Sequence, residues 1–548
     1  MERNCCACKI MIVLSGLVLA INGATALHID NKVSTVQAFG IGENVVVTDD
    51  TSTRPSYHDY LQNRKTFLQR EQSKGIGADI ALNDREVLAN DIIMKAKYEE
   101  LEAGFANPFK FIPSRHIFEV LDQVKSSRLF NLIRHMPKGA ILHAHDMALC
   151  STDFVVSLTY RPYLWECRNS TKNSISFKFS RIAPTSSHGC PWTLVSTERR
   201  RMGKQSYDRE LRKHFTLYTE NPLTKFKDIN DVWSRFINIF ITIQPLVTFL
   251  PVWKDYFSRA LTEMYEDNVQ YLEFRGVLPE LYDLDGNKYS KADVVQIYYD
   301  TLNDFKQEHP DFIGAKFIYG PSRKVTNSTF SDYMRTVVEL EKQFPNFLAG
   351  FDLVGQEDLG RPLSDFAESL LALPGNINFF FHTGETNWFG SSTDENLIDA
   401  VLLGTKRIGH GYAIVKHPSV LEVVKERGIA VEVNPISNQV LKLNTDNRNH
   451  PCSFLFANNY PVVISSDDPS FWEATPLSHD FYIAFLGIAS AHSDLRTLKQ
   501  LAINSIAYSS LNSAEKEIAF TKWQTKWDEY VEWIIQRDNS SAVSNLIP

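Results

Sequence analysis

The pattern of hydrophobic and polar positions changes near residue 139. From there on, short apolar runs alternate with stretches of helical periodicity, and we count eight such runs, at 139–145, 269–278, 314–320, 347–355, 378–385, 407–414, 430–438 and 461–469. Near-continuous apolar runs of this length are typical of parallel strands that are buried on both faces. Eight strand-and-helix repeats predict an α/β fold, a (β/α)8 TIM-type barrel with its active site at the C-terminal ends of the strands.

The preceding residues, 27–125, are rich in charge and have helical periodicity. Within 84–103, for example, apolar residues recur at spacings of one, three and four. We therefore expect an N-terminal helical region that either packs on the main domain or forms a dimer, because both arrangements bury its apolar face. The chain has 548 residues and is 43% hydrophobic, which is enough for one large domain with additions.

The connection between the first two predicted strands, from 145 to 269, is far too long for a single crossover helix. It predicts an insertion at about 155–214, between the start of the barrel at 126–154 and the rest of it at 215–548. Cys167 and Cys190 lie there in a stretch rich in Ser, Thr, Arg and Pro, where a disulfide would supply the order that a small core cannot. We favour this pair, with Cys150 and Cys452 free and partly buried.

The predicted insertion also carries a basic cluster, Arg199-Arg200-Arg201 with Lys204. Such a cluster is usually a solvated surface, and the alternative is a binding site for an acidic polysaccharide or a receptor. The whole chain has a formal net charge of -8 and a pI near 6.0, which gives no electrostatic case for binding nucleic acid. Small molecules or other proteins are the expected partners.

The first 26 residues have the pattern of a secretory signal peptide. Arg3 and Lys9 precede an apolar run at 10–21, and the small residues of 24–26 form a cleavage pattern. A membrane anchor is the alternative, but about a dozen apolar residues are short for the roughly 20 that span a bilayer, and no later run approaches a span. Three N-x-S/T sequons fit a secreted, extracellular glycoprotein, at Asn169, Asn327 and Asn539.

Residues typical of a metal site lie in the predicted strands, at or near their C-terminal ends. His143 and His145 are two apart in an extended segment, so their side chains share one face. By themselves they are as readily two incidental strand histidines. His382, His410 and Asp467 lie at or near the ends of three later strands, where they can converge with the pair at one barrel mouth. Zinc binds histidine nitrogen and carboxylate oxygen, and a catalytic zinc keeps one position open for water.

The motifs HAHD, HTGET, RIGHG and SSDDP, in this order, resemble those of the adenosine deaminase superfamily of metal-dependent amidohydrolases. The segments MPKGAILHAHD, VWSRF, AGFDLVG, RIGHGYA, NPISNQVLKL, VISSDDP and DLRTLKQLAINS look most like the secreted adenosine deaminase growth factors. That subfamily has an N-terminal dimerisation region and a disulfide-bonded insertion after the first strand. The resemblance therefore implies a homodimer, with 27–125 as its dimerisation region and 155–214 as a candidate receptor- or glycan-binding domain.

The resemblance also implies a role for each residue of the site. One Zn2+ per subunit would be bound by His143, His145, His382 and Asp467. Glu385 would protonate the purine N1, His410 would orient the attacking water and help its ionisation, and Asp467 would share that task. The substrate would be bound by Asp468 at the purine N7, by the backbone of Gly355 at the N3 side, and by Asp146 and Trp233 at the ribose end.

The implied activity is hydrolytic deamination of adenosine and 2'-deoxyadenosine to inosine and 2'-deoxyinosine, which would lower extracellular adenosine. Zinc suits this reaction because it lowers the pKa of water from about 15.7 to about 7. One alternative is a signalling protein that uses the barrel as a scaffold, and the two functions can coexist. Another is a specificity for AMP or an N6-modified adenine. Asp146 at the ribose end argues against a nucleotide, which would need basic groups near its phosphate.

The sequence departs from the family pattern at three positions near the predicted site. Thr383 stands where we expect alanine, Asn387 where we expect aspartate, and Asn434 where related enzymes often have cysteine. None of them is a predicted ligand or proton carrier. They therefore bear on affinity and fine geometry rather than on the presence of activity.

Overall fold

The structure is a computed structural model that describes residues 54–169, 174–185 and 190–544. The predicted signal peptide, 1–26, lies outside the described residues, as does the beginning of the predicted N-terminal region. The chain divides into two units, 1–62 and 63–548. The described part of the first unit contains the start of α1 (Tyr57–Gln72), and the second unit contains everything discussed below.

Eight parallel strands lie in the eight predicted apolar runs. They are β1 (Gly139–Ile141), β5 (Val269–Gly276), β8 (Gly314–Tyr319), β9 (Leu348–Phe351), β10 (His382–Thr383), β11 (Arg407–His410), β12 (Ala430–Val433) and β13 (Val462–Ile464). Each strand is shorter than its apolar run. The residues beyond the strand ends, such as 142–145 after β1, leave the regular ladder. Together with His382 of β10 and His410 of β11 they supply the side chains of the site.

The strands close into a barrel. Their pairing gives two parallel rows, β1-β5-β8-β9 and β10-β11-β12-β13. The rows are joined at one seam by the bridge between Phe351 and Phe379, and at the other by the bridge between Ala144 and Asp467. At the second seam the amide of Asp467 donates to the carbonyl of His143 at 3.0 Å. The predicted α/β barrel is confirmed, and this seam brings the first and last strands of the barrel together at the site.

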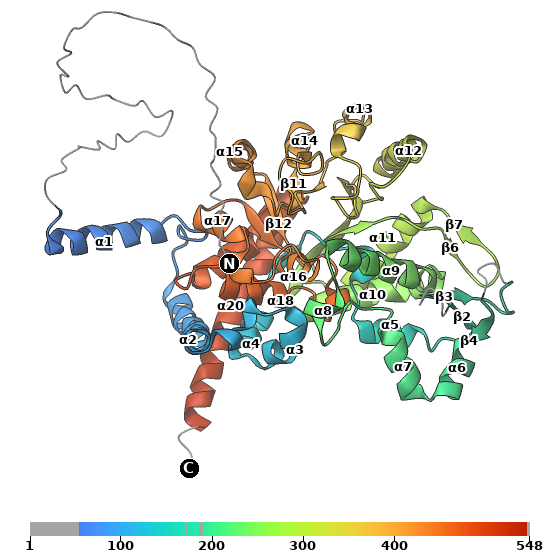
Figure 1. The fold of residues 1–548 in the computed structure, drawn as a ribbon, viewed down its shortest axis with the longest axis horizontal. Helices are drawn as coiled ribbons and strands as arrows, with labels where there is room; N and C mark the ends of the chain where they lie inside the picture. The colour runs from blue at the N-terminus through green and yellow to red at the C-terminus, as the bar shows by residue number, and fades with distance from the viewer. Residues whose placement is uncertain (1–53, 170–173, 186–189, 545–548) are drawn as a thin grey trace, which may run out of the picture. The chain divides into compact units, whose positions relative to one another are not determined.

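Helices surround the strands, and Figure 1 shows α12 to α15 in a row outside them. Before β1 come α2 (Asp84–Ala106), α3 (Ile117–Ser126) and α4 (Arg128–His135). Between β1 and β5 lie α5 (Thr152–Leu158), α6 (Val195–Met202), α7 (Lys204–Arg212), α8 (Pro222–Lys225), α9 (Ile229–Val247) and α10 (Leu250–Glu266). The crossovers of the other strands contain α11 (Lys291–Glu308), α12 (Asn327–Gln343), α13 (Ala367–Leu371), α14 (Asn396–Leu402), α15 (Pro418–Arg427), α16 (Pro435–Val440) and α17 (Cys452–Ala457). The chain ends with α18 (Ser478–Ile483), α19 (Leu495–Ala507) and α20 (Ser513–Ser544).

The N-terminal helix α2 packs on the C-terminal helices α19 and α20. Glu86 connects all three, because its carboxylate accepts from Lys499 of α19 at 2.6 Å and from the indole N–H of Trp527 of α20 at 2.7 Å. Asn83 begins α2 with a capping box, in which its side chain and that of Glu86 each accept from a backbone amide. Of the two arrangements expected for this region, the structure therefore shows packing on the barrel domain for α2.

The described residues of 164–212 contribute a small antiparallel sheet and two helices between β1 and β5, and we call this segment the small subdomain. Its antiparallel sheet has the order β3-β2-β4, formed by β2 (Leu164–Asn169), β3 (Ser174–Phe179) and β4 (Trp192–Leu194), and α6 and α7 follow it. A disulfide joins Cys167 to Cys190, with their Cα atoms 5.6 Å apart, as we expected. Cys150 and Cys452 are free, but they are fully buried rather than partly so. A short hairpin, β6 (Leu281–Tyr282) and β7 (Lys288–Tyr289), follows β5.

The basic cluster of this subdomain is divided between the interior and the surface. Arg199 is buried, forms an ion pair with Asp208 at 2.8 Å, and stacks over the ring of Tyr160. Arg200 and Arg201 are exposed. The expectation of a solvated cluster is therefore wrong for Arg199 and holds for its two neighbours.

The predicted sequons fall at different kinds of position. Asn169 ends β2, Asn327 is the exposed first residue of α12, and of Asn539 the structure describes only the backbone, within α20. Among the described residues, no helix is both long enough and apolar enough to cross a membrane.

Candidate metal centre and active site

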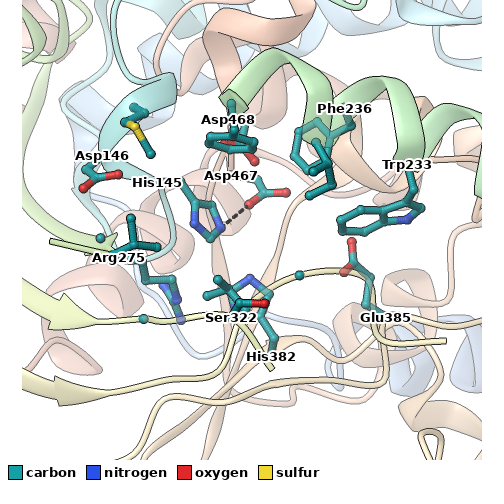
Figure 2. Close-up of a pocket in the computed structure, with 18 of the residues that line it drawn as sticks. His145, Asp146, Trp233, Phe236, Arg275, Ser322, His382, Glu385, Asp467 and Asp468 are labelled. Carbon is teal, nitrogen blue, oxygen red and sulfur yellow. Dashed lines mark ion pairs between the residues drawn. The ribbon is translucent and has the colours of Figure 1, made fainter. Parts of the chain in front are cut away.

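A cavity of about 250 Å³ opens at the C-terminal ends of the barrel strands. Its floor carries His382 of β10, His410 at the end of β11, and residues that follow β1, β10 and β13, and its wall includes one face of α9. Figure 2 shows His145 and Asp467 at the centre of this cavity, with Glu385 and Trp233 on one side of them and Asp146 on the other. The position agrees with the usual location of active sites in (β/α)8 barrels.

Four predicted metal ligands converge at the floor of the cavity, and His145, His382 and Asp467 line it. One ligand atom from each of His143, His145, His382 and Asp467 lies within 4.8 Å of the other three. The Nε2 atoms of His143 and His382 are 3.0 Å apart, and the Nε2 of His145 is 3.0 Å from Oδ1 of Asp467. The same oxygen lies 3.3 Å from Nε2 of His143, so it is close to two of the three histidines. The sequence prediction therefore brought together residues that the fold places side by side.

Carboxylates determine which ring nitrogen carries the hydrogen in His143 and His382. Nδ1 of His143 lies 2.7 Å from Glu432, and Nδ1 of His382 lies 2.6 Å from Asp352. A carboxylate accepts the Nδ1 proton, so in each neutral ring the lone pair is on Nε2. Two lone pairs that face each other at 3.0 Å repel unless a cation lies between them. The donor set of three imidazoles and one carboxylate therefore fits a divalent metal such as zinc.

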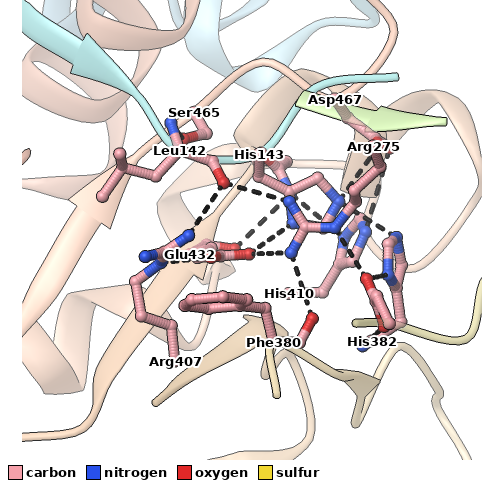
Figure 3. A network of polar contacts seen from close by, with 12 residues as sticks. Leu142, His143, Arg275, Phe380, His382, Arg407, His410, Glu432, Ser465 and Asp467 are labelled. Carbon is pink, nitrogen blue, oxygen red and sulfur yellow. Dashed lines mark hydrogen bonds and ion pairs between the residues drawn. The ribbon is translucent and has the colours of Figure 1, made fainter. Parts of the chain in front are cut away.

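Arginines connect these carboxylates under the site (Figure 3). Arg275 donates from Nε to Asp352 at 2.6 Å and from Nη2 to Glu432 at 2.7 Å, so one guanidinium supports both histidine partners. Arg407 donates to Glu432 and also to Glu273. Burial alone would raise the pKa of Glu432, but Arg275 and Arg407 outweigh it and hold that pKa well below its usual range. The carboxylates therefore stay ionised as hydrogen-bond acceptors for the histidines.

Two charged residues to which the sequence gave no role, Glu357 and Arg323, hold the segment of Glu385 over the candidate metal centre. Glu357 accepts from the backbone amide of Glu385 at 2.6 Å and from that of Gly384 at 3.2 Å. Arg323, to which the sequence gave no role, donates to the carbonyl of His382 at 2.6 Å and lies 3.7 Å from Glu357. Both residues are buried, and they lie a few residues after the ends of β8 and β9. A charged residue shortly after an apolar run was the signal in the sequence that could have identified them.

Glu385 has the character of a buried acid. One of its carboxylate oxygens has no hydrogen-bond partner and the residue is buried. Burial raises its pKa well above the usual range, and the negative charges of Asp467 and Glu357 raise it further. A carboxyl group with a raised pKa stays protonated near neutral pH and can give that proton to a bound molecule.

The four predicted substrate-binding residues all line the cavity, namely Asp146, Trp233, Gly355 and Asp468. Asp468 is buried, and its Oδ1 has no hydrogen-bond partner. Asp146 accepts from the hydroxyl of Tyr298 at 3.0 Å, and burial raises its pKa to about 7. Figure 2 draws Asp146 and Trp233 on opposite sides of His145, so these two residues do not lie at one common end.

His410 and Asp467 complete the site in a strained backbone conformation. His410 has a φ of 61° and Asp467 a φ of 59°, values that are uncommon for residues other than glycine. Nε2 of His410 lies 3.9 Å from Oδ2 of Asp467, and Nδ1 lies 3.6 Å from Glu385. Strain of this kind persists where the surrounding contacts hold a residue in place, and it is concentrated at functional sites.

Comparison with known proteins identifies the family of this site. A family model for "Adenosine deaminase" matches residues 202–522, and one for "Adenosine/AMP deaminase N-terminal" matches residues 17–133. The chain belongs to the adenosine deaminase family. Its resemblance to that family is thereby confirmed, and it is a hydrolase.

Named relatives align with most of the chain. The chain is 56% identical to an adenosine deaminase of Aedes albopictus over 87% of its length and 89% of the relative. It is 43% identical to adenosine deaminase 2-A of Danio rerio and 41% identical to adenosine deaminase 2 of Homo sapiens, over 86% of this chain and 93% of each relative. Among solved structures, an N6-mAMP deaminase of Arabidopsis superposes with a TM-score of 0.53 at 17% identity, covering 72% of this chain and 99% of that one. This last similarity supports the barrel fold alone.

Proposed function

We propose that the protein is a zinc-dependent adenosine deaminase, which converts adenosine and 2'-deoxyadenosine to inosine and 2'-deoxyinosine with release of ammonia. The observation that carries this proposal is that the four candidate metal ligands lie together, and that three of them, His145, His382 and Asp467, line one cavity with the buried acid Glu385 and with Asp468, whose Oδ1 has no hydrogen-bond partner. The names of the relatives support it. When bound by His143, His145, His382 and Asp467, zinc would lower the pKa of a water molecule toward neutrality.

In the proposed reaction the residues of the chain move and hold protons. Water adds to C6 of the purine as Glu385 gives its proton to N1. One proton of the water passes to a carboxylate of the site and then to the amino group, the C6–N6 bond breaks, and ammonia leaves. The second proton of the water returns to Glu385, which restores the acid. Asp468 would hold N7, and its raised pKa, caused by burial and by Asp467, suits a carboxyl that donates to this nitrogen.

The charges that line the cavity favour a nucleoside over a nucleotide. Among the described residues that line it, the only arginine or lysine is Arg275, and its guanidinium already binds Asp352 and Glu432. A phosphate group would need a cation free to pair with it. Asp146 adds a carboxyl group that suits a ribose hydroxyl and would repel a phosphate. We therefore propose adenosine and deoxyadenosine, rather than AMP, as substrates.

The test is purified mature protein incubated separately with adenosine, 2'-deoxyadenosine and AMP, followed by ultraviolet absorbance, with zinc measured in the same samples. We expect loss of adenosine and deoxyadenosine and about one zinc per subunit. Turnover of AMP alone, or full activity in protein without zinc, would contradict the proposal. A matched pair sharpens the assignment: Glu385→Gln should be inactive yet retain zinc, whereas His145→Ala should lose both.

We also propose that the protein is secreted as a glycosylated homodimer, with 27–125 contributing to dimerisation and the 155–214 insertion contacting a receptor or sulfated glycan. The predicted signal peptide, the three sequons and the disulfide of the insertion support this proposal. Expression of the full chain in insect cells tests it, because the protein should accumulate in the medium as a dimer. Growth-factor activity is tested with Glu385→Gln protein: if this variant supports cell growth as well as the parent does, signalling does not need deamination.

A further inference from the structure

A row of buried polar side chains reaches His410 on the side that faces away from Asp467. It comes from the segment that follows β12 and from His450 beyond α16. The amide nitrogen of Asn438 lies 3.2 Å from Nδ1 of His410, and that of Asn434 lies 3.5 Å from the same atom. Asn434, Asn438, His410 and His450 are all buried, so their hydrogen bonds are made within the protein, and only Oδ1 of Asn434 among these four side chains has no partner.

The hydrogen of His450 can be placed from its neighbours. The backbone amide of Cys452 donates to Nδ1 of His450 at 3.1 Å. A backbone amide can only donate, so this Nδ1 is an acceptor. Burial lowers the pKa of His450 to about 3, and in a neutral imidazole the other nitrogen then carries the hydrogen. Nε2 of His450 therefore donates to Oδ1 of Asn438 at 2.9 Å.

This contact orients the amide of Asn438. Its oxygen faces His450, so its NH2 group faces His410. Asn434 is oriented in the same sense, because its nitrogen also lies 3.4 Å from the backbone carbonyl of Glu432, which can only accept. Both amides thus present N–H groups to Nδ1 of His410. Glu385 is 3.6 Å from that nitrogen, which is beyond hydrogen-bond range, and does not compete for it.

The consequence is a fixed tautomer for His410. Nδ1 accepts, so the hydrogen is on Nε2, the nitrogen on the side of Asp467. A ring in this state can donate a hydrogen bond to the oxygen of an attacking water molecule. It cannot take a proton from that water, because the nitrogen that faces it already carries one.

We propose that His450 and Asn438, assisted by Asn434, are positioning residues that hold His410 as the Nε2–H tautomer and so make it a hydrogen-bond donor to the nucleophile rather than its base. The proposal rests on the proposed deaminase function. It gives Asn434, where related enzymes often have cysteine, a definite part, since its amide supplies a second donor to Nδ1. It also leaves the proton of the water to a carboxylate of the site.

Neutron diffraction of deuterium-exchanged crystals of the zinc-loaded enzyme tests the tautomer directly. We expect a deuteron on Nε2 of His410 and on Nε2 of His450, and none on Nδ1 of either ring. A deuteron on Nδ1 of His410 would overturn the proposal. This measurement does not depend on activity, so the tautomer can be established even if adenosine proves not to be the substrate.

Kinetics of two variants at Asn438 separate positioning from packing. At about pH 8 the side chain of Asn438→Asp is ionised and can only accept, so it should draw the hydrogen of His410 to Nδ1. We expect kcat to fall by about 100-fold or more with KM changed less than about threefold, the size of effect seen when one preorganised donor is lost. Asn438→Leu leaves Asn434 as a donor and should lose only about tenfold. If packing alone mattered, the isosteric aspartate would be the milder change, and that order would contradict the proposal.

Two further comparisons complete the test. His450→Gln keeps an N–H for Asn438 and should retain most of kcat, whereas His450→Leu frees the amide to rotate and should lower kcat. Equal kcat values for His450→Leu and the parent would show that His450 does not position Asn438. Asn449→Asp, at an exposed neighbouring position, is the matched control and should leave kcat unchanged. Zinc content is measured for every variant, so that a lost metal is not mistaken for a changed tautomer.

Discussion

Asp352 binds His382 at two points: Oδ2 lies 2.6 Å from Nδ1 of the ring, and Oδ1 accepts from the backbone amide of the same histidine at 2.8 Å. The carboxylate thus fixes both the tautomer and the position of a predicted metal ligand. Oδ2 also accepts from Nε of Arg275, so the ligand is connected to the charged network beneath the barrel. Partners of this kind are expected to tune the affinity of a metal site as well as its geometry.

Replacing Asp352 with Asn should weaken zinc binding. An amide oxygen is a poorer acceptor than a carboxylate, and the loss of charge also leaves Arg275 underpaired. We expect zinc affinity to fall by about 10- to 100-fold. Competition with a coloured chelator measures this in the absence of substrate. Asp365→Asn, at an exposed residue that pairs with Arg361, is the control and should bind zinc like the parent. Equal zinc affinity in Asp352→Asn would show that the pair does not support the metal.

Removing the disulfide should destabilise the small subdomain more than the barrel. Cys167 and Cys190 are 23 residues apart, and closing a loop of that length is worth about 3 kcal/mol in the chain-entropy description. In a double Cys167→Ser and Cys190→Ser variant we expect faster proteolysis between residues 164 and 212. Deamination should be reduced less, because the metal ligands lie outside this segment. Limited proteolysis with mass spectrometry locates the first cleavage. First cuts within the barrel would contradict this picture.

Apolar patterning predicted the barrel because its strands are buried on both faces, which marks each of them in the sequence. The ligands were also predictable, since His143, His145, His382 and Asp467 lie toward the C-terminal ends of such runs. The pairing of these ligands with carboxylates was not. Glu432 lies inside an apolar strand and Asp352 just beyond one, so patterning gives no sign of their partners. Their roles depend on contacts between strands that are far apart in sequence.

Sequence reasoning was weaker where one cluster contains residues with different environments. Arg199, Arg200 and Arg201 are adjacent, yet the first turns inward to Asp208 and Tyr160 while its neighbours face solvent. On a helix, neighbouring residues point in directions about 100° apart, so a run of three identical residues cannot share one environment. Arg199 was not identifiable as the buried residue without knowing which face of α6 packs against the rest of the subdomain.

Arg199→Ala should therefore destabilise the subdomain, and Arg200→Ala should not. Arg199 loses an ion pair, hydrogen bonds to Thr159 and a stacked ring, a loss on the order of 3 kcal/mol for a mostly buried pair. Arg200→Ala should change the free energy of unfolding by less than about 0.5 kcal/mol. Hydrogen exchange across 164–212 measures the difference. Binding to a heparin column tests the surface residue instead. If the insertion binds sulfated glycans, Arg200→Ala should elute at lower salt than the parent. Equal protection from exchange in the two variants would contradict the assignment of Arg199 to the interior.

The pH dependence of kcat/KM should show whether Glu357 raises the pKa of Glu385. After burial and Asp467, the negative charge of Glu357 is the next cause that raises the pKa of Glu385. Glu357→Gln removes this charge, so Glu385 ionises more easily and its pKa falls. Because the acid must be protonated to act, a lower pKa leaves less of the active form at any alkaline pH. The alkaline limb of kcat/KM, which reports on the free enzyme, should therefore move to lower pH.

The same substitution should also lower kcat, since a glutamine cannot accept from both backbone amides that Glu357 now holds, those of Gly384 and Glu385. The pH at which the alkaline limb lies separates a lower pKa of Glu385 from a displaced Glu385. A displaced acid with an unchanged pKa reduces the rate at every pH and leaves the limb in place. Glu368→Gln, at an exposed residue of α13, is the control and should leave the profile unchanged. Full pH profiles of kcat/KM for the three proteins make the comparison. An alkaline limb in Glu357→Gln that stays in place or moves to higher pH would show that Glu357 does not set the acidity of Glu385.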